Sequence, residues 1–129
     1  MSAEYPGMNL PFIAGQDLST KQFLFMNLAT DGQIDPCGNG ADSIGVLQDK
    51  PNAAGLVASC MVSGVSQVIA GGVLDEGQRV TSDANGKAVA TIAEDEYVLG
   101  VVYKPAGAEN EIAEILLMIP GVKDLNQVA

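Results

Sequence analysis

Apolar residues along this chain gather in short runs, and each run ends at a glycine, a proline or an Asx-Gly pair. Runs of about four to eight residues, with a turn about every eight to twelve residues, are typical of the strands of an all-β sandwich or barrel. Residues 111–119 begin with a helical spacing, but they take the place of the apolar run LVASCMV earlier in the chain, so we expect a strand there. The expected strands cover residues 22–28, 43–48, 56–62, 65–70, 79–81, 87–91, 97–103 and 111–119.

The same order of runs and turns occurs twice. The offsets are 56, 55 and 54 residues for three matched motifs: Ile13-Ala14-Gly15 with Ile69-Ala70-Gly71, Ile44-Gly45-Val46 with Leu99-Gly100-Val101, and Asp31-Gly32 with Asn85-Gly86. The Asx-Gly pairs predict hairpin turns. Two copies of one sheet unit can bury each other's open faces. We therefore predict a small β-barrel or sandwich built from two tandem pseudo-repeats, repeat one at about 13–64 and repeat two at about 65–121, in a single β domain, 13–129, with a short C-terminal tail.

Residues 1–12, MSAEYPGMNLPF, precede the first repeat and differ from it in composition. Their two prolines argue against a regular helix or a central strand. Their apolar side chains argue that the segment lies on a surface. We predict an extended N-terminal arm; a disordered terminus is the alternative.

Composition and charge reduce the number of possible functions. The chain has 129 residues, of which 47% are hydrophobic and only 5% aromatic, so the core must be built from small and branched side chains. The net charge is −10 with six basic residues, which argues against nucleic-acid binding because that requires clustered Lys and Arg. There is no signal-peptide pattern and no apolar run long enough for a membrane span, so we expect a cytosolic protein with no membrane partner, whose cysteines, Cys37 and Cys60, are free thiols.

The residues for common catalytic chemistry are missing. The chain has no histidine, and it has no GxSxG, HExxH, P-loop or GxGxxG motif, so we expect no enzyme, no cofactor and no metal site. Asp83-Ala84-Asn85-Gly86 and Glu94 resemble part of a calcium loop, but Lys87 stands at a ligand position. Lys87 also lacks the neighbours of a carrier-domain lysine. Carboxylates, for example Asp31, Asp75 and Asp83, leave a cytosolic β-barrel enzyme or a carrier module as the alternative.

Residues 65–121 resemble the small capsid cement, or head decoration, proteins of tailed phages. The resemblance rests on a Gly71-Gly72 break, the run LDEGQRV at 74–80, Asn85-Gly86-Lys87-Ala88, the run VLGVV at 98–102, Gly107 and a last apolar strand ending at Gly121. Repeat one shares this resemblance to cement proteins through the internal duplication.

The resemblance implies a structural virion protein that binds the outer surface of the phage head and stabilises contacts between major capsid protein subunits. It implies assembly with neighbouring copies of itself as a homotrimer, and a location on the capsid exterior, with the host cytoplasm as the location before assembly. It also implies that the N-terminal arm contacts the partner, and the residues concerned would be Tyr5, Met8, Leu10, Pro11 and Phe12.

Overall fold

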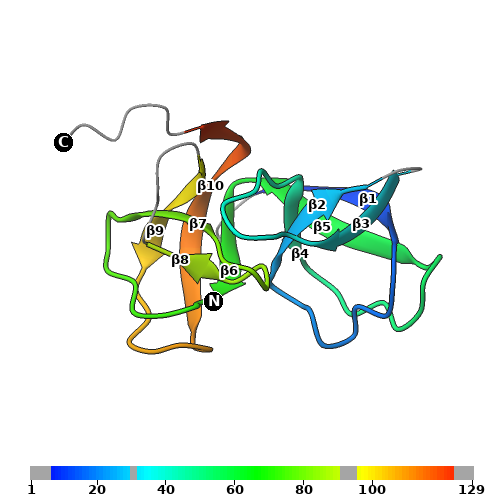
Figure 1. Ribbon diagram of the computed structural model, residues 1–129, viewed down its shortest axis with the longest axis horizontal. Helices are drawn as coiled ribbons and strands as arrows, with labels where there is room; N and C mark the ends of the chain where they lie inside the picture. Colours follow the sequence, from blue (N-terminus) through cyan, green and yellow to red (C-terminus); the bar gives the residue numbers. More distant parts are fainter. Residues whose placement is uncertain (1–6, 30–31, 91–95, 124–129) are drawn as a thin grey trace.

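The computed structural model describes residues 7–29, 32–90 and 96–123, and the elements within them are all strands (Figure 1). Their bounds agree with the expected strands to within a few residues for most of the chain. Nothing in these segments is a helix of the length and hydropathy that would cross a membrane. The strands are β1 (Met8–Ala14), β2 (Phe25–Leu28), β3 (Gln33–Pro36), β4 (Gly45–Leu47), β5 (Val57–Ser63), β6 (Val65–Ile69), β7 (Arg79–Ser82), β8 (Ala88–Val89), β9 (Tyr97–Lys104) and β10 (Ile112–Lys123).

Each repeat forms a five-stranded sheet of its own. In repeat one the order β1-β3-β2-β4-β5 closes into a barrel, because β1 pairs with both β3 and β5. In repeat two the order is β6-β10-β9-β7-β8, and a parallel bridge between Ala70 and Ala88 joins its two ends. That bridge corresponds to the parallel pair Ala14–Ile34 of repeat one. The two sheets therefore have the same strand neighbours when β6–β10 are matched to β1–β5 in chain order.

The all-β fold and its pseudo-repeats are confirmed. The two repeats are alike even in single backbone hydrogen bonds. The Ala14 N–H donates to the Leu56 carbonyl at 2.8 Å, and the equivalent Ala70 N–H donates to the Glu111 carbonyl, also at 2.8 Å. Of the two expected forms, a barrel or a sandwich, the repeats do not form one common barrel. Instead they lie side by side, because each sheet finds its closing partner within its own repeat (Figure 1).

The core has two parts. One fills the barrel of repeat one and includes Met26, Leu47 and Cys60. The other fills repeat two, but Phe25 and Val46 of repeat one also belong to it. Successive side chains of a strand point to opposite faces, so β2 and β4 send one set into their own barrel and the other set into repeat two. The repeats thus share a core and form one body.

Close backbone approach explains the glycine in the repeated Ile/Leu-Gly-Val motif. A Cβ atom on residue 45 would lie 2.6 Å from the Met61 carbonyl oxygen, and one on residue 100 would lie 2.7 Å from that of Leu116. Both distances are too short for a side chain, so each repeat needs glycine where its fourth strand crosses its fifth.

Both predicted hairpins are present. Gly32 and Gly86 have φ of 75° and 85°, and equivalent bonds close the turns: the Ala29 N–H to the Gln33 carbonyl at 2.7 Å, and the Asp83 N–H to the Lys87 carbonyl at 2.8 Å. In the second hairpin only the glycine of the Asn-Gly pair has positive φ, as in loops of three residues with a glycine bulge. The strand expected at 22–28 begins only at Phe25.

Candidate partner-binding surface

Strand β1 contains four of the five residues that the sequence assigns to partner binding. Residues 8–13 pair antiparallel with β5, whereas β3 pairs with β1 only at Ile13 and Ala14. The segment is extended as expected, but residues 8–12 do not leave the domain, because their backbone is bonded to β5 of the same chain. Tyr5 lies outside the described residues.

Within the described residues, one edge of β1 therefore has no strand beside it from residue 8 to residue 12. The Ala14 N–H bonds toward β5 and the Gly15 N–H bonds toward β3, to the Ile34 carbonyl at 2.9 Å. N–H groups alternate along an antiparallel strand, so the nitrogen of Pro11 faces the free edge. Proline has no N–H to donate, and edge strands use it to discourage pairing with other chains. A partner at β1 is therefore expected to bind mainly to side chains.

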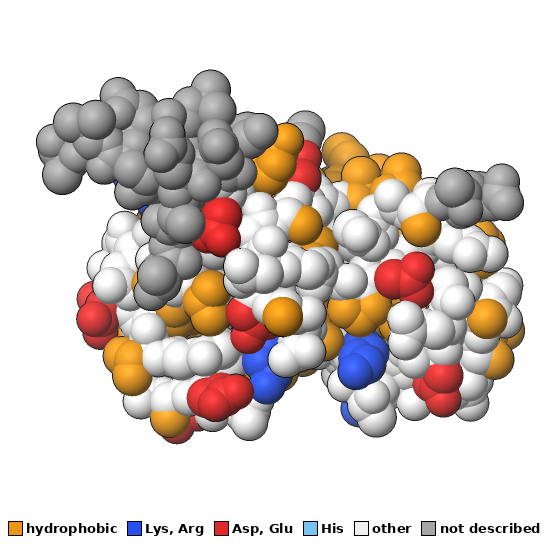
Figure 2. All heavy atoms as spheres, in the orientation of Figure 1, with side chains coloured by type: hydrophobic (Ala, Val, Ile, Leu, Met, Phe, Trp, Pro, Cys, Tyr) orange, Lys and Arg blue, Asp and Glu red, His pale blue; other side chains and the backbone are white. Residues whose placement is uncertain are grey.

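The side chains around β1 form an exposed apolar surface. Met8 is 56% and Leu10 is 42% exposed, and Val57 on β5 is 64% exposed. A hollow of about 360 Å³ is lined by Pro11, Phe12, Ile13, Gly32 and Val57. Figure 2 shows hydrophobic side chains gathered along the edge of repeat one over β1 and β2. The structure thus brings Pro11 and Phe12 together with Val57 of β5, while Met8 and Leu10 are exposed elsewhere along the same strand.

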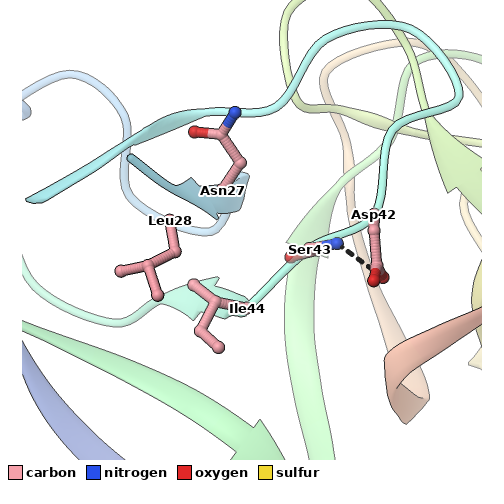
Figure 3. Close-up of a pocket in the computed structure, with 5 residues that line it drawn as sticks. All are labelled: Asn27, Leu28, Asp42, Ser43 and Ile44. Carbon is pink, nitrogen blue, oxygen red and sulfur yellow. Dashed lines mark hydrogen bonds between the residues drawn. The ribbon is translucent and has the colours of Figure 1, made fainter. Parts of the chain in front are cut away.

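A second hollow is lined by residues of β2 and of the segment before β4: Asn27, Leu28, Asp42, Ser43 and Ile44. It measures about 250 Å³, and Leu28 and Ile44 point toward one another across it (Figure 3). Leu28 is 51% exposed. The rim is polar: the Ser43 N–H donates to Asp42 Oδ1 at 2.8 Å. The Asn27 amide points away from the two apolar side chains. An apolar slot with one carboxylate at its rim suits a protein surface better than a reaction centre.

Sequence reasoning missed Leu28 and Val57. Both lie in runs in which nearly every residue is apolar, so alternation could not show which side chains face outward. The only available signal was their position at the end of an expected strand.

Of the carboxylates considered for catalysis, Asp75 and Asp83 lie on two different turns. Asp75 is exposed on the turn before β7. Asp83 accepts hydrogen bonds from the Asn85 and Lys87 N–H groups, at 2.8 and 2.9 Å, and so stabilises its own hairpin. Asp31 and Glu94 lie outside the described residues. Across 7–29, 32–90 and 96–123 there is no group of three residues that could hold a metal ion.

The lysine and the two cysteines considered above also lie in surroundings that suit a structural role. Lys87 Nζ lies 3.4 Å from Glu109 Oε2, and its side chain is largely buried. Cys37 and Cys60 are buried free thiols. Burial raises the pKa of each thiol from 9.0 to about 12, so neither forms the reactive thiolate near neutral pH.

Comparison with known proteins agrees with an exposed apolar surface for protein contacts. A family model described as phage cement protein matches residues 7–119. The chain belongs to the phage cement protein family. No curated protein matches the chain. A solved structure, described as the head fiber gp8.5 N base in bacteriophage phi29, is 18% identical, covers 89% of this chain and 98% of its own, and superposes with a TM-score of 0.69. At that identity the likeness shows a common fold. As a member of the cement family, the chain is a structural protein of the phage virion.

Proposed function

We propose that this cement protein binds the outer surface of the phage head and stabilises contacts between major capsid protein subunits. The observation that carries the proposal is the family match over residues 7–119. The likeness to a head fiber base supports it at the level of fold. The role is non-enzymatic, and before assembly the protein is in the host cytoplasm.

The partner-binding residues of the proposal are Met8, Leu10, Pro11 and Phe12, preceded in the chain by Tyr5. Their support is the apolar surface described above, which a protein exposed only to water has no reason to keep. A shell offers many identical sites, so a modest contact at each one gives a large collective stabilisation. Contacts with neighbouring copies, in a homotrimer, would add to it.

Binding to heads tests the proposal directly. Expanded heads that lack this protein are mixed with purified protein and sedimented, and the protein is expected to sediment with them. Val57→Asp places a charge in the hollow beside β1 and is expected to weaken binding at least tenfold. Ile112→Asp is the matched control, because Ile112 holds the equivalent position on β10 and is 43% exposed. If the wild-type protein stays in the supernatant, the proposal is wrong; if both variants bind like wild type, the assigned surface is wrong.

A further inference from the structure

The two repeats differ in how one end of each is covered. In repeat two, Val68, Ser82 and Leu99 have no exposed surface. Repeat one lies over them: the Phe25 N–H donates to the Gly86 carbonyl at 2.8 Å, and the Gly40 N–H donates to the Ser82 carbonyl at the same distance. A Cβ atom on residue 86 would meet the Phe25 oxygen at 3.0 Å. This end of repeat two is therefore closed by repeat one.

Among the residues that the structure describes, none covers the equivalent end of repeat one in this way. Leu28 takes the place of Ser82 and is 51% exposed, and Gly32 takes the place of Gly86 and has nothing within 4 Å of its Cβ position. Larger apolar side chains stand where the covered end has serine, since Leu10 corresponds to the buried Ser66. We call this surface the open end; its members are Leu10, Phe12, Leu28, Gly32 and Ile44.

The face that covers repeat two also has an equivalent. It consists of Phe25, Val46 and Met61, which lie opposite one another on β2, β4 and β5. In repeat two the same register places Arg79, Val101 and Leu116 opposite one another on β7, β9 and β10. Leu116 is 50% exposed, Arg79 is exposed and Val101 is half-buried. We call these three residues the free face. Each chain thus has an open end and a free face related by its own internal duplication.

We propose that the free face of a second copy covers the open end of repeat one, head to tail, in the way that repeat one covers repeat two within the chain. The proposal deepens the proposed function, on which it rests, by giving the contact between neighbouring copies a surface: the open end, which includes Leu10 and Phe12 of β1. The charges agree, because Asp42 borders the open end and Arg79 lies on the free face. Two different surfaces meet in such a contact, so copies join into a ring if the rotation closes.

The internal contact specifies where to place a cross-link. Within the chain, a Cβ atom on residue 86 would lie 3.3 Å from the Cβ of Leu24. The Leu24 carbonyl accepts from the Leu47 N–H, and the Gln78 carbonyl accepts from the equivalent Val102 N–H, so Gln78 corresponds to Leu24. Between two copies, the corresponding pair is Gly32 and Gln78. Disulfides require Cβ atoms about 4 Å apart, so cysteines at these positions are close enough to join.

Gly32→Cys and Gln78→Cys proteins are mixed under mild oxidation and run on a non-reducing gel. The expected product is a dimer that contains one chain of each variant, at least tenfold more abundant than the dimer of either variant alone. Glu76→Cys replaces Gln78→Cys as the control, because Glu76 is exposed nearby but corresponds to Gln22, which is not among the nearest neighbours of residue 86 within the chain. Cys37 and Cys60 are buried in every variant and do not compete.

Association of the protein without cysteine changes gives a second measurement. Its mass in analytical ultracentrifugation is expected to rise with concentration, and Leu28→Asp is expected to keep it monomeric. The proposal is overturned if the Gly32–Gln78 pair links no better than the control pair, or if Gly32→Cys chains link to each other. If cross-linking fails while the wild-type protein still sediments with expanded heads, the head-to-tail contact is wrong and the proposed function stands.

Discussion

Replacing each of the two hairpin glycines by alanine should separate two contributions to the free energy of unfolding. One is the strain of a side chain in the turn, and the other is crowding at the contact between the repeats. Gly32 and Gly86 have φ of 75° and 85°, so alanine is strained at either position, by about 1–2 kcal/mol. At Gly32 the new methyl group meets nothing within 4 Å, and the strain is the whole cost. At Gly86 it meets the Phe25 oxygen at 3.0 Å and the Leu24 Cβ at 3.3 Å. Crowding of this kind costs about 1–3 kcal/mol more.

The assay is urea unfolding followed by circular dichroism, at a concentration where the protein is monomeric. We expect Gly32→Ala to lower the free energy of unfolding by about 1–2 kcal/mol, and Gly86→Ala to lower it by about 2–5 kcal/mol. Equal slopes against urea are required for the comparison, because a changed slope means a changed extent of unfolding. If Gly86→Ala destabilises no more than Gly32→Ala does, repeat one does not press on the hairpin of repeat two, and the basis for the open end is lost.

Three other changes test the rest of the structure. Phe25→Ala removes a fully buried ring shared by the two repeats and should cost about 3–5 kcal/mol in the same urea assay; a loss below 1 kcal/mol would contradict a shared core. Stability should fall as pH rises from 9 toward 12, because the unfolded thiols ionise while Cys37 and Cys60, with pKa values of about 12, stay protonated; a variant with alanine at both should show a shallower fall in urea midpoint against pH. Asp83→Ala removes the acceptor of two N–H groups in its hairpin and should cost about 1–3 kcal/mol without changing the amount of protein bound to heads; lost binding at full stability would give Asp83 a functional role.

The duplication could be predicted from the sequence because the residues that reveal it are required by the local backbone at single positions. Gly45 and Gly100 are each required where two backbones meet, and Gly32 and Gly86 are each required where a hairpin needs positive φ. Such positions tolerate only one residue type well, so they leave a pattern that can be read without a structure. Most strand positions followed from them.

The arrangement of the two repeats could not be predicted, because it depends on which face of a strand each apolar residue occupies. Phe25 and Met26 are adjacent and equally apolar, yet one faces repeat two and the other faces its own barrel. The exposed Leu28 was hidden for the same reason. Pairing of residues 8–13 with β5 is a contact between distant segments, and the prolines of the first residues concealed it. The candidate surface was therefore predicted in part, as β1 alone.

Release of DNA on heating is the most direct test of a cementing role. Heads that lack this protein are filled with DNA, divided in two, and heated with or without the purified protein while a dye reports free DNA. The account predicts that the added protein raises the temperature at which DNA escapes, and that Val57→Asp does so less well than Ile112→Asp. Identical release curves with and without protein, under conditions where the protein coats the heads, would contradict it.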